Sequence, residues 1–92
     1  MSILMIHDAS DSTIGEYDRV IKELEVAGQS NPPGRLSHVA VRKGDGYLVA
    51  DVWESQEAFD RFAQTLVPLL ERAGGRVAAP RLYPVHNTIE GA

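Results

Sequence analysis

Hydrophobic residues recur along this chain with two different periods, and together they predict six elements. Short apolar runs bounded by turn residues predict strands at 2–8, 36–43, 47–53 and 77–86. Apolar residues spaced three and four apart predict one helix after Thr13 and a second after Ser55. The expected order is therefore strand, helix, strand, strand, helix, strand.

The two predicted helices carry start and stop signals. Thr13, with Glu16 three residues later, forms a capping box at the start of the first helix. Ser55 is the expected N-cap of the second helix, and the Gly-Gly pair at 74–75 is expected to end it. Because Pro68 lies inside the second helical pattern, we expect it to kink that helix or loosen its last turns.

This order predicts an α+β fold, a ferredoxin-like βαββαβ protomer in a single domain covering residues 1–92. Right-handed crossovers give a four-stranded antiparallel sheet with both helices on one face. We expect the first and third strands in the middle, as parallel neighbours. The last strand contains two prolines and belongs at an edge. Since two helices cannot cover both faces, we expect a homodimer formed through the sheet faces, a dimeric α/β barrel.

Composition narrows the classes of partner. A net charge of −4 with scattered basic residues argues against nucleic-acid binding. The absence of cysteine excludes thiolate catalysis and cysteine-ligated metals. The apolar opening of the chain is short and lacks a basic segment before it, so we expect neither a signal peptide nor a membrane span, and a cytoplasmic protein.

A tight turn at 44–45 would join the second and third strands as a hairpin and fix their register. Side chains alternate across a strand, so paired residues of this register share a face. A slip of one residue would separate them. The predicted pairs are His38 with Asp51, Arg42 with Tyr47, and Leu36 with Trp53.

This register suggests a candidate site at the mouth of a cleft between sheet and helices. A carboxylate beside an imidazole fixes the tautomer of the ring and strengthens it as a base. We therefore predict His38, Asp51 and His7 as catalytic residues, with His7 near the same end of the sheet as Asp51. An indole offers a flat surface for an aromatic ligand. The residues predicted to bind a small hydrophobic or aromatic ligand are Trp53, Tyr47, Tyr17 and Phe59.

Each of these residues also has a structural interpretation. Trp53 can simply pack the joint between sheet and helix, and Asp51 can hydrogen-bond a neighbour without any catalysis. Two histidines and Asp51 match a metal-binding triad in residue type, although nothing in their spacing requires a metal. His86 should lie near Ile3, too far away to complete a three-histidine centre. Arg35, Arg76 and Arg81 could meet an anionic substrate, but the preferred interpretation is that they are solvated surface residues.

Three segments suggest a family. The stretch 52–59, in which a strand runs into Trp-Glu-Ser-Gln-Glu-Ala-Phe, resembles the antibiotic-biosynthesis-monooxygenase-like members of the dimeric α/β-barrel superfamily. Segments 17–20, 51–55 and 84–87 are similar to those of small bacterial members of that group. The resemblance covers nearly the whole chain and is more specific for fold than for activity.

The resemblance implies a dimer with a pocket in each subunit, and oxidation of quinol- or anthrone-like polyketides by molecular oxygen without a cofactor. Trp53 corresponds to a pocket tryptophan of those enzymes. Heme-degrading members have an asparagine where His7 falls and need a histidine on the second helix, which this chain lacks. The asparagine of anthrone-oxidising members is also missing, since Val49 and Asp51 occupy that region.

The leading hypothesis is a cofactor-independent monooxygenase-like enzyme that abstracts a proton from a phenolic or polyketide-type substrate. A cyclase or isomerase could use the same residues, since those reactions also begin with proton abstraction. The competing hypotheses are a non-catalytic dimeric ligand-binding or stress-related protein, whose cleft Phe59, Phe62 and Tyr17 would fill, and a metal-dependent lyase or dioxygenase.

Overall fold

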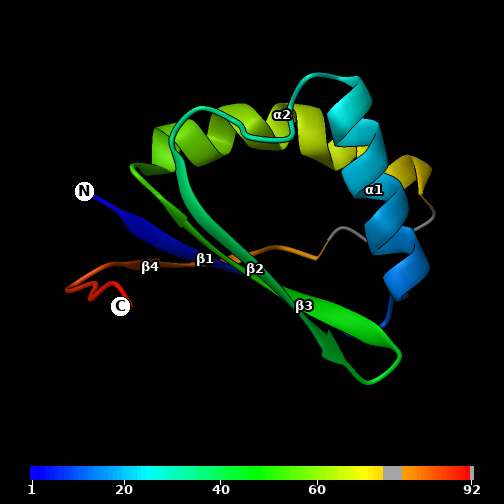
Figure 1. Ribbon diagram of the computed structural model, residues 1–92, viewed down its shortest axis with the longest axis horizontal. Coiled ribbons are helices and arrows are strands. Elements are labelled where there is room, and N and C mark those ends of the chain that lie inside the picture. Colours follow the sequence, from blue (N-terminus) through cyan, green and yellow to red (C-terminus); the bar gives the residue numbers. More distant parts are fainter. Residues whose placement is uncertain (74–77, 92) are drawn as a thin grey trace.

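The computed structural model describes residues 1–73 and 78–91, and it confirms the predicted order of elements. Both helices lie over one face of a four-stranded antiparallel sheet (Figure 1). The strand order β2-β3-β1-β4 confirms that the first and third strands are central and the last is at an edge. The elements are β1 (Ile3–Ala9), α1 (Ile14–Val26), β2 (Arg35–Lys43), β3 (Gly46–Trp53), α2 (Gln56–Arg72) and β4 (Arg81–Pro84).

The relative direction of the two central strands was predicted wrongly. β1 and β3 are antiparallel, with His7 paired to Val49 and Met5 paired to Asp51. The crossover through α1 makes β1 parallel to β2, and β3 is joined to β2 by a tight hairpin. β3 is inserted between them and must run against both. His7 therefore lies toward the hairpin end of the sheet rather than at the end that carries Trp53.

The helix starts follow the predicted capping. The Thr13 hydroxyl accepts a hydrogen bond from the Glu16 amide at 3.1 Å, and the Ser55 hydroxyl accepts one from the Ala58 amide, also at 3.1 Å. α2 continues through Pro68 to Arg72, so the proline does not end the helix. The Gly-Gly pair at 74–75 lies outside the described residues. Neither helix within the described ranges combines the length and apolar character needed to cross a bilayer.

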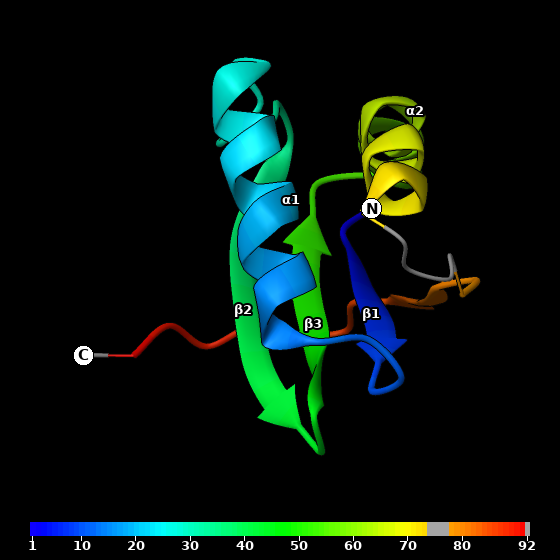
Figure 2. The same ribbon diagram turned by 90° about the vertical axis from the view of Figure 1, so that its right-hand side faces the viewer.

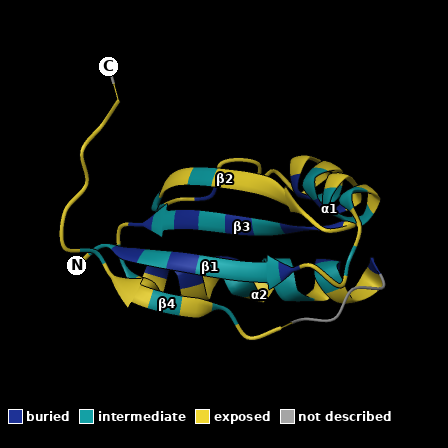
Figure 3. Cartoon of the chain, turned by 90° about the horizontal axis from the view of Figure 1, so that it is seen from below, coloured by how far each residue is buried: buried dark blue, intermediate teal, exposed yellow. Residues whose placement is uncertain are grey.

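The last strand is shorter than predicted. β4 pairs with β1 only over Arg81–Pro84, where Pro84 lies opposite Ile3. Pro80 precedes the strand and Pro84 is its last residue, and neither has an N–H to donate to the ladder. One further backbone hydrogen bond follows, from the Val85 amide to the Ser2 carbonyl at 2.9 Å. The predicted start at Val77 lies outside the described residues. Beyond β4 the chain leaves the body of the protein as an exposed segment (Figures 2 and 3).

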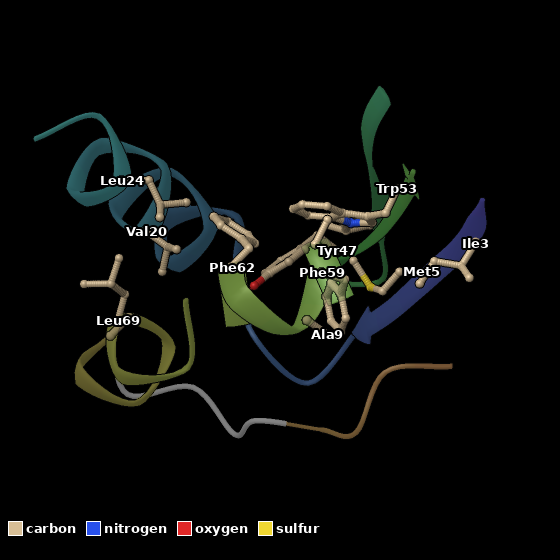
Figure 4. Close-up of a cluster of buried hydrophobic side chains, with 13 residues drawn as sticks. Ile3, Met5, Ala9, Val20, Leu24, Tyr47, Trp53, Phe59, Phe62 and Leu69 are labelled. Carbon is tan, nitrogen blue, oxygen red and sulfur yellow. The ribbon is translucent and has the colours of Figure 1, made fainter. Parts of the chain in front are cut away.

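The core lies between the sheet and the helices, and Trp53 is at its centre. The indole is fully buried and packs against Phe59 and Phe62, with ring centroids 5.7 and 5.3 Å away (Figure 4). The opposite face of the sheet carries no helix. Val39 and Val41 of the edge strand β2 project from it with 55% and 48% of their surfaces exposed, and Tyr83 lies on β4 at the other edge.

Candidate functional site

The β2–β3 hairpin places the central pair of the site. Its turn contains Gly44 with φ of 60°, and the register brings His38 opposite Asp51 and Arg42 opposite Tyr47, as predicted. The predicted partner of Trp53 was wrong. Arg35 occupies that position because the register shifts between residues 35 and 37. Leu36 is the extra residue of this irregularity and is 61% exposed.

His38 and Asp51 form a close pair at the floor of the site. His38 Nδ1 lies 2.6 Å from Asp51 Oδ1, and Asp51 is the one buried charged residue of the described part of the chain, 3% exposed. An ionised carboxylate can only accept hydrogen bonds, so Nδ1 carries the proton and donates it. The other ring nitrogen, Nε2, is then the acceptor of the neutral imidazole.

Tyr17 of α1 occupies that second nitrogen. Its hydroxyl lies 2.7 Å from His38 Nε2. With Nδ1 as the protonated ring nitrogen, Nε2 is the acceptor and the Tyr17 hydroxyl is the donor. The two rings are stacked at an interplanar angle of 10°, and Tyr47 packs edge-on against Tyr17 at 5.0 Å. Burial, reinforced by the negative charge of Asp51, raises the pKa of Tyr17 above its usual value. The phenol is therefore held in its protonated form at neutral pH.

These three side chains face a cavity of about 160 Å³ between the sheet and the helices. Its walls are mostly apolar, and the polar groups are concentrated on the sheet side. An apolar cavity of about 150 Å³ is large enough to hold one benzene molecule. The cavity can thus accept a single aromatic ring. Its apolar walls come from both helices and from β1 and β3, and include Met5, Val20, Leu24, Val49, Phe62 and Leu66.

His7 lies on another part of the cavity wall. Its ring centroid is 6.2 Å from that of Tyr47, and the ring is part of the cavity lining. Burial lowers the pKa of His7 below 6.5, while the nearby acidic residues Asp8, Asp11 and Asp51 act in the opposite direction and only partly offset it. The imidazole of His7 is therefore mainly neutral at pH 7.

The structure brings most of the predicted site residues to one cavity and leaves one out. His38, Asp51, His7, Tyr17, Tyr47 and Phe59 all line it. Trp53 is not part of this lining, because Phe59 and Phe62 pack against the indole and it is fully buried. Phe59 and Phe62 form walls and do not fill the cavity.

The geometry gives the metal-dependent alternative no support. Over residues 1–73 and 78–91, no group of three or more histidine or acidic side chains lies close enough together to hold a metal ion.

Sequence reasoning did not anticipate two features of this site. Arg35 was interpreted as a surface residue, yet it lines the cavity while its guanidinium donates to the Ser30 carbonyl at 2.8 Å. Arg81 is exposed, as expected, and Arg76 lies outside the described residues. The hydrogen bond between Tyr17 and His38 was also unforeseen. The helical spacing of Tyr17 indicated that it faces the sheet, but no local signal specified which β2 residue it meets.

Comparison with known proteins supports the fold. A crystal structure of a "putative antibiotic biosynthesis monooxygenase" from Caulobacter crescentus CB15 matches with a TM-score of 0.59. The match covers 96% of this chain and 89% of that protein at 17% sequence identity. No family model and no curated protein matches the sequence. The chain therefore has an antibiotic-biosynthesis-monooxygenase-like, ferredoxin-like fold.

Proposed function

We propose that this protein is a small monooxygenase-like enzyme that needs no cofactor and begins its reaction by abstracting a proton from a hydrophobic phenolic or polyketide-type substrate. One observation carries the proposal. A hydrogen-bonded His38–Asp51 pair faces a cavity whose remaining walls are largely apolar and which has room for an aromatic ring. The fold likeness to a protein described as a monooxygenase agrees with it.

The roles of the two residues follow from their geometry. The imidazole of His38 is the proton acceptor, and Asp51 holds the ring in the tautomer whose Nε2 is basic. When the ring becomes an imidazolium, the buried carboxylate beside it stabilises the charge. The apolar walls keep water away from the anion formed on the substrate, which leaves it able to reduce molecular oxygen.

The overall oxidation balances without an external reductant. A CH₂ group flanked by aromatic rings loses a proton, its carbanion adds O₂, and the resulting hydroperoxide loses water. The net change is CH₂ plus O₂ to C=O plus H₂O, so the substrate supplies every electron that oxygen accepts. His7, neutral and on the cavity wall, is placed to hydrogen-bond an oxygen substituent of the substrate.

Oxygen uptake with hydroquinones and anthrones tests this function. We expect the wild-type protein to consume oxygen with at least one of them, and Asp51→Asn to lower turnover by about a hundredfold while substrate affinity is largely kept. The asparagine occupies the same space but cannot stabilise an imidazolium. Unchanged turnover of an accepted substrate in Asp51→Asn would reject the role of the pair.

A non-catalytic ligand-binding protein is the second candidate, and the apolar lining of the cavity favours it. The two functions predict different results for the wild type and Asp51→Asn. An enzyme turns over its substrate as wild type and loses turnover in the variant. A binding protein binds aromatic ligands in both forms and turns them over in neither. A cyclase or isomerase would also use the His38–Asp51 pair but would consume no oxygen.

We also propose that the protein forms a homodimer through the uncovered sheet face. Exposed valines and the edge residue Tyr83 make that face apolar, and burying such a surface is favourable. A chain of 92 residues has a small core of its own, so a partner sheet would add substantially to its stability.

A further inference from the structure

We propose that the hydroxyl of Tyr17 is the group that receives the substrate proton, and that His38 and Asp51 act behind it as a relay. The inference rests on the proposed function and refines it. The imidazole of His38 is hydrogen-bonded at both nitrogens, to Asp51 Oδ1 at 2.6 Å and to the Tyr17 hydroxyl at 2.7 Å. A substrate in the cavity therefore meets no free imidazole nitrogen.

The hydroxyl of Tyr17 has the right hydrogen-bonding capacity for this role. Its single proton is donated to His38 Nε2, which leaves the lone pairs of its oxygen able to accept a proton from a bound O–H or C–H acid. Tyr17 itself lines the cavity. Tyr47, the other tyrosine of the cavity, packs edge-on against Tyr17 and holds its ring in place.

The transfer balances in two linked steps. The substrate proton moves to the Tyr17 oxygen as the original phenolic proton moves to His38 Nε2. His38 becomes an imidazolium whose Nδ1–H still donates to the Asp51 carboxylate. The substrate becomes an anion, Tyr17 is again a neutral phenol, and one proton has been gained by His38. Because burial and Asp51 disfavour a free phenolate, the two movements must be concerted.

The relay also predicts a preference for phenolic substrates. A phenol donating to Tyr17 extends a chain of hydrogen bonds that ends at a buried carboxylate, and each member polarises the next. The ring of such a ligand would lie against the apolar walls formed by the two helices. The size of the cavity favours a substrate that inserts one ring, with any further rings outside.

Binding of para-nitrophenol tests the relay independently of turnover, because its phenolate is yellow and the neutral form is not. The buffer is kept below the pKa of the free phenol, and the ionised fraction of bound ligand is read at saturation. We expect the wild type to bind the yellow anion. Tyr17→Phe keeps the ring contacts but should bind the neutral phenol, lowering the ionised fraction about tenfold or more.

Two further variants make the result specific. Tyr83→Phe removes a hydroxyl from β4, outside the lining of the cavity, so it should leave the bound ligand ionised. His38→Gln keeps a hydrogen-bonding side chain that cannot accept the proton, and it should abolish ionisation. Circular dichroism verifies that each variant is folded.

The outcomes separate the inference from the proposed function. If Tyr17→Phe ionises the phenol as fully as the wild type while His38→Gln does not, His38 contacts the substrate directly; the relay is then wrong and the proposed function stands. If the wild type itself binds only neutral phenol, both the relay and the proton-accepting role of the site are wrong.

Discussion

At the scale of single residues, the most consequential feature is the buried carboxylate of Asp51. A buried charge without a hydrogen-bond partner is strongly destabilising. His38 supplies that partner, so the pair has a structural role whatever its chemistry. The contribution of the pair to stability has to be measured separately from its contribution to activity, because an unfolded variant is inactive whatever the role of the pair.

We predict that His38→Ala lowers the free energy of unfolding by about 1–3 kcal/mol, because it leaves the Asp51 carboxylate buried and unpaired. Urea denaturation at pH 7 measures the change. The matched control is Arg42→Ala on the same strand, where the side chain is exposed and the change should stay within about 0.5 kcal/mol. Equal effects of the two substitutions would contradict this account of the pair.

His7 should make the stability of the protein depend on pH. Burial lowers its pKa below 6.5, so between the folded and unfolded pKa values the unfolded chain binds more protons than the folded one. Stability then falls as the pH drops below 6.5. We predict that the urea midpoint of the wild type decreases between about pH 7.5 and about pH 5.5 more than that of His7→Gln. Parallel pH profiles of the two proteins would show that His7 does not contribute.

The pair of Asp8 and Lys43 gives a second electrostatic prediction. Hydrogen bonds from the Lys43 ammonium and from Ser10 lower the pKa of Asp8 to about 2. We expect Lys43→Met to return this pKa toward 3.8, as followed by NMR titration of the Asp8 carboxyl carbon. Because both side chains are solvent-accessible, stability should change little. An unmoved titration would mean that the ion pair is not populated in solution.

At the scale of elements, the close approach of β1 to the hairpin depends on Gly46. A Cβ at this position would lie 2.2 Å from the Ala9 carbonyl oxygen, a backbone atom that cannot move aside. We predict that Gly46→Ala destabilises the protein by about 1–3 kcal/mol, since the end of β1 must shift.

In α1, by contrast, a Cβ at Gly15 meets only Thr13 Oγ1 at 3.7 Å. Gly15→Ala should therefore stabilise the protein by about 0.5–1 kcal/mol. Thermal unfolding of the two variants compares them, and opposite signs are required.

The elements also show what could be predicted from the sequence. The helix starts at Thr13 and Ser55 follow from local signals, and the structure confirms them. The register of the hairpin is confirmed from His38 to the turn, but not at Trp53, where the bulge shifts it. The direction of β1 relative to β3 was missed because it depends on how the crossover and the hairpin combine, which no single segment encodes. The length of β4 was overestimated because an apolar pattern shows that a segment can pair but not where its partner strand ends, and β1 begins at Ile3, opposite Pro84.

The candidate site was predictable to the same extent. His38 and Asp51 meet because they are on neighbouring strands whose turn fixes their register. The burial of Trp53 and the contact between Tyr17 and His38 depend on how the helices sit on the sheet. Those positions are set by packing of the whole core, so helical spacing identified the face on which Tyr17 lies but not its partner.

At the scale of the whole molecule, the uncovered sheet face is the surface on which the proposed homodimer depends. Figure 3 shows the sheet from this side. Val39 and Val41 lie on that face, on β2, and the central strands contribute further apolar side chains such as Leu4, Leu48 and Val52. If two copies pair there, a charge within the contact would be buried without a partner, which is costly. A monomer would leave the same charge in water.

We therefore predict that Val39→Lys converts the dimer to a monomer, as measured by sedimentation equilibrium. Val26→Lys is the matched control, because Val26 is 85% exposed at the end of α1, away from the sheet face, and the same change there should leave the dimer intact. The cavity lies on the other side of the sheet, so monomeric Val39→Lys should still bind para-nitrophenol, although the smaller core makes it easier to unfold. A wild-type protein that sediments as a monomer would contradict the proposed homodimer, and a Val39→Lys variant that remains dimeric would place the contact elsewhere.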